Sequence, residues 1–432
     1  MILIIITVFA AAFFMMWTNS IRHGRFYLNH RTCITAGYLF YVLLPLFLLE
    51  SGVQFQDSVY QRLRDHYMCI PVKNKLYYIF VSFVWLAAFF MGCRCKKIRI
   101  VSSRYLLDAE RASRSYRYLQ KGIFLAVLLF ELLLLYRGRS QLFTGYAGDI
   151  TVSLRGTLYA GLIILFSLLL LNYFARNERG IKAVLKNKWG IFYIILALLV
   201  LTTGGRLYVV SNLVALMIAV TYLDGKGIPL QKLAGFFAAA LLAVGFIGSW
   251  RLSGVFGTEG VADISFESIF YNILQEPLYT NFSIITYLAG SNVLRLFSFP
   301  KVFFSSWINM VPSIVMPDKA NYILTIADRE PSVSAPLGAL HYFTTFNIDF
   351  GFLFAALFFF ALGYWLSRLE RKCGENAALY CTVYVLASSN LMFTLYRDPV
   401  SVSVIKNIFE FSIMVPAIVS WACAAAVKKK GI

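Results

Sequence analysis

The chain has 432 residues, of which 59% are hydrophobic and 14% charged, and its mean hydropathy is +0.69. Soluble domains are about 45–50% apolar and about 25% charged, so this composition excludes an ordinary soluble protein. A net charge of +19 would suit nucleic-acid binding, but most Lys and Arg residues lie in every second loop between the apolar segments, and therefore on one side of the membrane. That distribution is the positive-inside pattern of membrane proteins, and we expect no nucleic-acid partner.

Eleven apolar segments follow one another along the chain, and most approach the ~20 residues that a helix needs to cross a bilayer. They are residues 2–17, 33–50, 76–92, 122–136, 157–174, 190–201, 207–223, 233–249, 352–366, 377–395 and 402–427. Runs such as residues 161–171 do not alternate between apolar and polar side chains, as the strands of a membrane barrel must. The sequence therefore predicts an all-α polytopic membrane protein with about 11 transmembrane helices.

The order of charges predicts the orientation. No basic residue precedes the first apolar segment, whereas Arg22, Arg25 and Arg31 follow it, so we expect an outer N-terminus and a permanent first anchor rather than a cleaved signal peptide. Of the seven cysteines only Cys69 is expected outside, so no intramolecular disulfide is predicted there. No histidine lies at zinc spacing from a cysteine pair, and we expect no metal site.

Three regions are predicted: residues 1–249 with eight spans, residues 250–351 as one large outer loop, and residues 352–432 with three spans. Inside the outer loop, apolar residues recur at helical spacing over residues 266–275, which predicts an amphipathic helix that ends at Pro277. Residues 302–310 are apolar and aromatic but too short to span a membrane. The outer loop is therefore expected to be a helical lid seated on the bilayer.

Two short outer turns carry charges that invite a functional interpretation. Arg206 follows a Gly-Gly pair at a predicted helix start, where backbone amides and a guanidinium together suit an anion. The plainer interpretation is an interfacial arginine that meets lipid phosphate. Arg397 and Asp398 occupy a turn so short that both must lie at the outer membrane face, as a site or as a structural ion pair. Lys406 and Glu410 share a helix face and are candidates for lining a polar cavity.

The outer loop holds the candidates for acid–base chemistry. His341 lies among aromatic residues and is a candidate general base, although such a histidine is more often structural. In Asp328-Arg329-Glu330 a carboxylate is suited to activate a hydroxyl group and the arginine to hold a phosphate; a solvated loop is the alternative. Several outer arginines together suit a lipid-linked diphosphate, because arginine binds phosphate bidentately and stabilises such a leaving group without a metal.

Three places in the sequence resemble one family. Thr203-Gly204-Gly205-Arg206 is similar to the turn between two spans of the Wzy-type oligosaccharide repeat-unit polymerases, which include the O-antigen and enterobacterial-common-antigen polymerases. Ala320-Asn321-Tyr322, followed by Ser334-Ala335-Pro336, resembles the end of that family's large loop. Arg397, in a short turn before the last span, also resembles a feature of that family. The overall arrangement, with one dominant outer loop before the last spans, covers nearly the whole chain.

The resemblance implies a C-type glycosyltransferase-like membrane fold in the bacterial inner membrane, with an active site that faces the periplasm. It implies an inverting transfer of the growing glycan from undecaprenyl diphosphate to an incoming lipid-linked repeat unit, without metal or cofactor. A chain-length regulator and a flippase are implied as partners besides membrane lipid. The implied roles are diphosphate binding by Arg206, Arg251, Arg329 and Arg397, proton abstraction by His341, Glu330 or Asp328, and sugar contacts by Trp250, Asn321, Tyr322 and Tyr342.

Other functions stay open at this point. An O-antigen ligase would share the architecture, but such ligases often carry a His-Asn pair in the large loop, whereas here Tyr342 follows His341. A transporter or flippase of lipid-linked oligosaccharide would more often show two repeated halves. No internal repeat is evident, and one long outer loop favours an enzyme that works on one face. A non-catalytic assembly protein is the weakest alternative.

Overall fold

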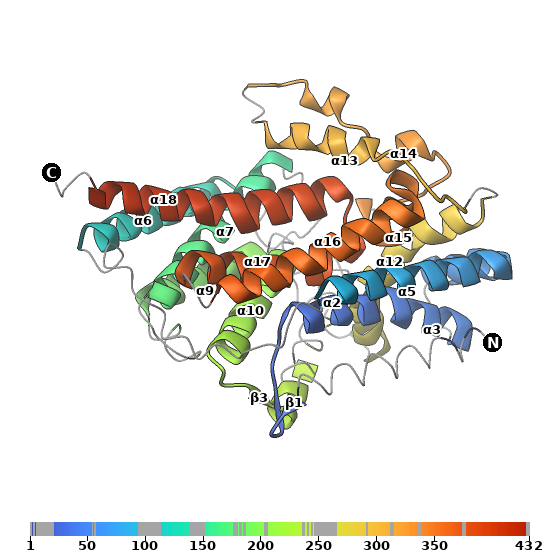
Figure 1. The fold of residues 1–432 in the computed structure, drawn as a ribbon, viewed down its shortest axis with the longest axis horizontal. Helices are drawn as coiled ribbons and strands as arrows, with labels where there is room; N and C mark the ends of the chain where they lie inside the picture. Colours follow the sequence, from blue (N-terminus) through green and yellow to red (C-terminus); the bar gives the residue numbers. More distant parts are fainter. Residues whose placement is uncertain are drawn as a thin grey trace, which may run out of the picture.

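The computed structural model describes residues 21–53, 58–93, 114–138, 152–175, 187–202, 206–235, 266–290, 293–311, 315–335, 338–373 and 377–428, together with a few isolated positions outside these ranges. Helices make up most of the described chain, and the long ones run roughly along the longest axis of the molecule (Figure 1). A small antiparallel sheet joins β1 (Ile21–Arg22), β2 (Arg25–Phe26) and β3 (Ile228–Pro229) in that order. Within the described ranges, these two-residue strands are the only regular secondary structure other than helix.

The helical elements follow one another along the chain, and η marks a π- or 3₁₀-helical piece. They are α2 His30–Tyr38, η1 Leu39–Leu43, α3 Leu44–Ser51, α4 Ser58–Met68, α5 Val72–Cys93, α6 Arg114–Arg137, α7 Val152–Ala175, α9 Lys188–Thr202, α10 Arg206–Ile218, η4 Ala219–Leu223, α12 Phe266–Leu288, α13 Lys301–Ser306, η6 Trp307–Met310, η7 Lys319–Tyr322, α14 Ile326–Arg329, α15 Tyr342–Asp349, α16 Gly351–Lys372, α17 Ala377–Arg397, η9 Ser401–Met414 and α18 Val415–Lys428.

Six helical stretches among the described residues are long and apolar enough to cross a membrane. They are His30–Ser51, Val72–Cys93, Arg117–Arg137, Gly351–Lys372, Ala378–Arg397 and Ser401–Cys423, and three shorter apolar helices cover Leu158–Phe174, Lys188–Leu201 and Leu207–Leu223. These helices agree with the prediction of an all-α membrane-embedded protein. The count of eleven spans and the three-region division stay predictions, because the segments at residues 2–17 and 233–249 lie mostly outside the described residues.

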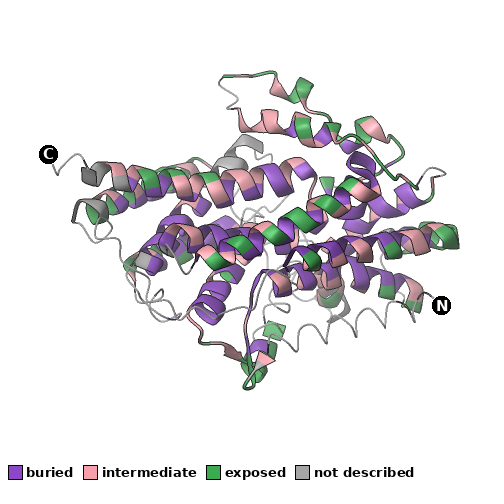
Figure 2. Cartoon of the chain, viewed as in Figure 1, coloured by how far each residue is buried: buried purple, intermediate pink, exposed green. Residues whose placement is uncertain are grey.

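We use "outer end" for the end of the bundle that the charge pattern predicts to lie outside, where α3, α6 and α17 end and where α5, α16 and η9 begin. Two buried clusters fill the bundle: one joins α5, α12, α15 and α16, and the other joins α6, α7, α10, α17 and α18. Buried residues occupy the middle of the molecule in Figure 2. Both clusters include side chains of α17 and contact η9, so the two clusters form one continuous core.

Helices α5 and α16 pack closely because glycine lies at their contact. A Cβ atom on Gly92 would come within 2.1 Å of the Phe360 carbonyl, and one on Gly363 would come within 2.1 Å of the Phe89 carbonyl. Small residues allow such close approach between membrane helices. Nearer the outer end, the Trp85 ring stacks on Phe359 with 5.8 Å between centroids. Trp85 Nε1 also donates to the Phe352 carbonyl over 2.9 Å, which fixes the start of α16 where the outer loop returns to the bundle.

The predicted end of the amphipathic helix at Pro277 is wrong. Helix α12 continues through Pro277 to Leu288. Proline removes one helical hydrogen bond and crowds the preceding turn, but Leu278, Ile284 and Leu288 are buried against the first cluster and offset that cost. Asn281 also donates to the Pro277 carbonyl over 2.7 Å. Tertiary packing thus overrides the local break.

Candidate functional site

Four polar side chains from three distant parts of the chain meet at the outer end. We call Tyr41, Glu276, Arg397 and Asp398 the outer charge cluster. Tyr41 Oη donates to Glu276 Oε1 over 2.8 Å, and Arg397 Nη1 lies 3.1 Å from the same oxygen. Arg397 Nε lies 3.7 Å from Asp398 Oδ1. A single guanidinium is therefore held between two carboxylates.

The cluster is placed by the helices that carry it. Arg397 is the last residue of α17, Tyr41 belongs to η1, and Glu276 lies in α12 directly before Pro277. The Tyr41 and Tyr396 rings stack, with 6.4 Å between centroids and 9° between planes. Tyr396 Oη donates to the Ile34 carbonyl over 2.9 Å, which fixes the end of α17 against α2. The guanidinium thus projects from a rigid helix end.

The cluster is open to solvent on one side. Side-chain exposure is 25% for Arg397, 41% for Glu276 and 14% for Asp398. Both side-chain contacts of Glu276 use Oε1, so among the described residues Oε2 makes no hydrogen bond or ion pair. Burial raises the pKa of Asp398 from 3.8 to about 6; Arg397 opposes this shift and Glu276 adds to it. The site therefore offers a cation, a carboxylate with an open oxygen and a second carboxylate that titrates near neutrality.

A backbone hydrogen bond brings His341 close to this cluster, but both ring nitrogens of His341 already have partners. The Leu340 amide donates to the Arg397 carbonyl over 2.8 Å, so the residue before His341 is tied to the cluster. His341 is fully buried, its Nδ1 accepts the Phe343 amide over 3.2 Å as the N-cap of α15, and its Nε2 lies 3.1 Å from Tyr78 Oη. An Nδ1 that accepts a hydrogen bond has no proton, so the ring is the neutral Nε2–H tautomer. Burial lowers the pKa of His341 to about 3.

That arrangement gives His341 a structural function in this conformation. Its basic nitrogen is directed at a backbone amide, and its other nitrogen is directed at a tyrosine. The predicted general base therefore does not have a lone pair that faces the outer charge cluster here.

The three charged residues of α14 and the turn after it go to three different partners. Asp328 caps α14 by accepting the Thr325 amide over 2.7 Å, and these hydrogen bonds lower its pKa. Glu330 pairs with Arg295 over 2.5 Å. Arg329 turns inward to Asp349. The run Asp328-Arg329-Glu330 is therefore not a single constellation, although all three side chains are ordered by specific contacts.

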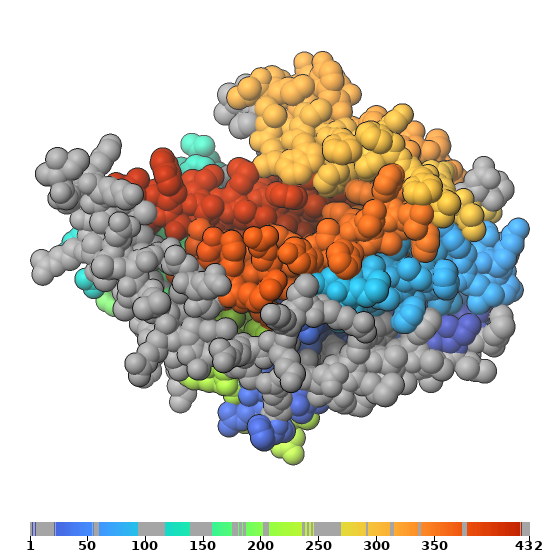
Figure 3. All heavy atoms as spheres, viewed as in Figure 1, coloured from blue at the N-terminus to red at the C-terminus, as the bar shows by residue number. Residues whose placement is uncertain are grey.

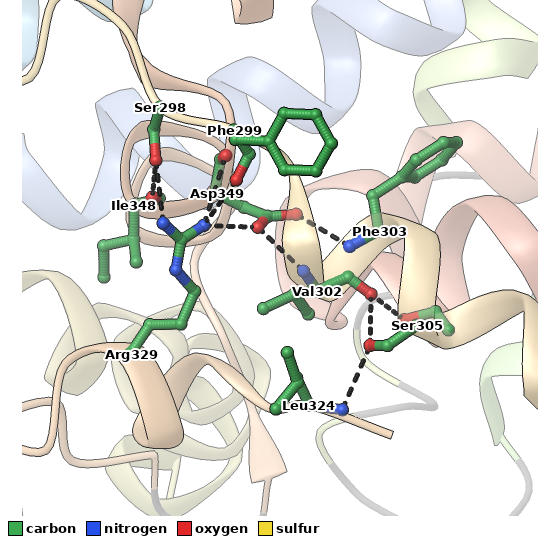
Figure 4. Close-up of polar contacts among 10 residues, drawn as sticks. Ser298, Phe299, Val302, Phe303, Ser305, Leu324, Arg329, Ile348 and Asp349 are labelled. Carbon is green, nitrogen blue, oxygen red and sulfur yellow. Dashed lines mark hydrogen bonds and ion pairs between the residues drawn. The ribbon is translucent and has the colours of Figure 1, made fainter. Parts of the chain in front are cut away.

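Arg329 and Asp349 form an anchor for the outer loop (Figure 4). Asp349 is fully buried; its Oδ1 accepts the Val302 amide over 2.9 Å and Arg329 Nη1 over 2.7 Å, and its Oδ2 accepts the Phe303 amide over 2.8 Å. Arg329 also donates to the Phe299 carbonyl over 2.9 Å and to Ser298 Oγ over 3.0 Å. With these contacts the guanidinium joins α14, α15 and the start of α13, so phosphate binding would require it to leave this network.

The other predicted site residues lie apart. Asn321 and Tyr322 belong to η7 and are exposed, Tyr322 by 59%. Tyr342 is buried among aromatic rings, with its centroid 5.2 Å from that of Tyr396. Arg206 is the first residue of α10, but its side chain lies outside the described part of the chain, as do Trp250 and Arg251 altogether. Across the described ranges, no group of three or more His, Cys, Asp or Glu side chains is placed to hold a metal ion.

Three residues of these networks are not evident from the sequence alone: Glu276, Tyr41 and Asp349. Glu276 resembles any polar residue of an amphipathic helix, and its partners lie 235 residues away at Tyr41 and 121 positions away at Arg397. Only Asp349 carries a local signal, because an acid flanked by Ile348 and Phe350 before a predicted span is costly unless it is paired.

No protein-family model, no curated protein sequence and no solved structure matches this chain.

Proposed function

We propose that the protein is a membrane glycosyltransferase that polymerises undecaprenyl-diphosphate-linked oligosaccharide repeat units at the outer face of the bacterial inner membrane. The observation that carries this proposal is the outer charge cluster: a guanidinium fixed at a helix end, partly open to solvent, beside a carboxylate whose Oε2 makes no hydrogen bond or ion pair among the described residues. The charge pattern of the sequence predicts that this end of the bundle lies at the outer membrane face, where the headgroup of a lipid-linked diphosphate would meet the protein. The Wzy-type resemblance supplies the substrate class.

The proposed reaction is one inverting substitution. The hydroxyl oxygen of the incoming repeat unit bonds to the anomeric carbon of the growing glycan, and the bond from that carbon to the diphosphate oxygen breaks. The hydroxyl proton goes to Glu276 Oε2, and undecaprenyl diphosphate leaves with its negative charge facing Arg397. A positioned carboxylate contributes about 10²–10⁴-fold as general base, and charge stabilisation of the leaving group adds to this.

The other members of the cluster orient these two groups. Tyr41 holds Glu276 through Oε1, and Asp398 holds Arg397 through Nε, so the carboxylate and the guanidinium each keep a fixed position in the cluster. His341 contributes by capping α15 and keeping Leu340 bonded to the Arg397 carbonyl. Arg206, Arg251, Trp250, Asn321 and Tyr322 stay proposed substrate contacts on the resemblance alone.

The test uses purified protein in detergent with a lipid-linked repeat unit, without ATP or added metal. We expect a ladder of glycan lengths from the wild type, and a fall of about 10²-fold or more in initial rate for Glu276→Gln, as loss of a general base requires. Arg397→Gln should be similarly impaired, because Gln keeps hydrogen-bonding capacity but removes the charge.

Arg295→Gln is the matched control. Arg295 is also an outer arginine paired with a glutamate, and its exposure of 24% is close to the 25% of Arg397. We expect Arg295→Gln to retain wild-type rates. A fully active Glu276→Gln variant together with an inactive Glu330→Gln variant would transfer the function of base to Glu330. Absence of any product, combined with movement of the substrate across liposomes, would favour the transporter alternative.

A further inference from the structure

An exposed apolar patch lies on the outer loop between the end of α12 and the end of α13. Its members are Leu294, Leu296, Phe297, Phe299 and Phe304, with exposures between 52% and 75%. We call them the outer apolar patch. In Figure 3 this part of the chain, yellow to orange, stands at the surface next to α16. Five large apolar side chains within eleven residues is more than scattered surface hydrophobicity and indicates a contact surface.

The patch continues the membrane-facing side of α16. The Phe297 ring lies 5.6 Å from that of Phe354, in the first turn of α16. Phe354, Leu357 and Phe360 are exposed by 41%, 63% and 44% along a helix that is long and apolar enough to cross the membrane. An apolar stripe on a membrane-spanning helix faces lipid, so the patch begins where that stripe reaches the outer end.

The irregular backbone of the patch is hydrogen-bonded to the same helix. Phe352 and Leu353 donate their amides to the carbonyls of Arg295 and Leu296 over 2.8 and 3.1 Å, and Ser298 donates to the Phe350 carbonyl over 3.1 Å. The first amides of a helix have no hydrogen-bond acceptor within that helix, and here the loop supplies acceptors for two of them. Non-helical backbone near hydrocarbon needs partners from the protein for its polar groups, and these three contacts with residues 350–353 supply them for Arg295, Leu296 and Ser298.

The chain beyond the patch reaches down the side of a second span. The Trp307 ring lies 4.7 Å from that of Phe409, eight positions into the span that begins at Ser401. At about 1.5 Å per residue the contact lies roughly 12 Å along the span from its outer end. Lys319 donates to the carbonyls of Asn309 and Val311 over 3.2 and 2.8 Å, which satisfies backbone groups at the end of η6.

We propose that the outer apolar patch inserts into the outer leaflet of the bilayer, with phospholipid as its occupant. The exposed Lys301 lies between Phe299 and Phe304 along the chain, so its ammonium group is placed to meet lipid phosphate while the rings enter the acyl region. Together with the Arg329–Asp349 anchor, this contact holds the outer loop at the membrane surface. Insertion requires only the exposed side chains and α16, so it is independent of the glycosyltransferase proposal.

Nitroxide labels test the insertion directly. In a Cys69→Ser, Cys95→Ser background, single cysteines replace Leu294, Phe299 or Phe304 in full-length protein in phosphatidylcholine–phosphatidylglycerol vesicles. Leu357→Cys is the lipid-facing reference, and Ala327→Cys, exposed on α14, is the aqueous reference. We expect the three patch labels to be relaxed by oxygen as at position 357 and protected from the aqueous nickel complex by at least threefold relative to position 327.

Patch labels that the nickel complex reaches as readily as position 327 would overturn the proposal. Labels shielded from both reagents, with spin–spin broadening, would also overturn it, because a second copy of the chain would then cover the patch. A second measurement avoids substitution: a photoreactive probe dissolved in the vesicle hydrocarbon should label the peptide that carries residues 294–304 in the unmodified protein. Failure to label that peptide while α16 is labelled contradicts insertion.

Discussion

Replacement of Asp349 by Ala should loosen the outer loop more than any other single charge removal within it. The carboxylate is fully buried and serves Arg329 and the amides of Val302 and Phe303, while burial raises its pKa and these hydrogen bonds oppose the rise. Removing one partner of a buried ion pair costs about 3–5 kcal/mol, since the other charge is left uncompensated. Arg329 keeps 19% exposure and can reach water in part, so we expect the lower end of that range, about 3 kcal/mol.

The assay is thermal and urea unfolding of the purified protein in detergent. Asp328→Ala is the matched control, because Asp328 belongs to the same segment but is exposed at the start of α14. It should lower the free energy of unfolding clearly less than Asp349→Ala does. The double variant Arg329→Ala, Asp349→Ala should be more stable than the sum of the single changes predicts, as coupled partners require. Equal unfolding curves for Asp349→Ala and wild type would refute the anchor.

Particular contacts at three other residues lead to measurable effects. His341→Asn should lower the free energy of unfolding by about 1–3 kcal/mol through loss of the Tyr78 contact, yet retain glycosyl transfer; a stable but inactive variant would restore His341 as the base. Gly351→Ala should lower the free energy of unfolding by more than about 1–2 kcal/mol, because φ at this position is +70° and the new Cβ would lie 2.8 Å from the Phe297 backbone. Gly122→Ala is the control in the same unfolding assay and should be nearly neutral, because a Cβ at Gly122 would meet open space. Wild-type transfer should rise with pH through about 6 as Asp398 ionises, and Asp398→Asn should lose that limb; an unchanged pH–rate profile would contradict its function.

The same pKa fixes the sign of a stability effect. Folding raises the pKa of Asp398 from 3.8 to about 6, so the folded state holds this proton more tightly than the unfolded state. The stability that this proton contributes is complete below pH 3.8 and is lost as the pH rises through about 6. Asp398→Asn should therefore flatten the stability profile in that window, which unfolding measurements at a series of pH values would detect.

The spans could be predicted from composition because lipid imposes a simple rule. A helix that crosses hydrocarbon needs a long run of apolar residues whatever its neighbours are, so residues 33–50, 76–92, 352–366 and 377–395 fall inside helices of the structure. The end of α12 could not be predicted the same way. Local chemistry at Pro277 favoured a stop, and only the burial of Leu278 through Leu288 against other helices decides otherwise.

The candidate site was predictable only in part for the same reason. Arg397 and Asp398 could be predicted as candidates, because so short a turn between two apolar segments is expected to lie at the outer membrane face. Glu276 joins them through contacts between α12, η1 and α17, which no spacing in the sequence encodes. Arg329 is the converse case. Its guanidinium has the chemistry expected of a phosphate ligand, but the fold places the Asp349 carboxylate beside it. Charge type is visible in a sequence, whereas the partner that neutralises it depends on the fold.

Glycosyl transfer by the outer charge cluster is most directly tested by counting undecaprenyl diphosphate released for each glycosidic bond formed by the purified protein in the presence of a chelator. We expect one carrier released per bond, a ladder of products, and loss of both in Glu276→Gln and Arg397→Gln while Arg295→Gln keeps both. Substrate that crosses vesicle membranes without any carrier release would contradict the proposed reaction.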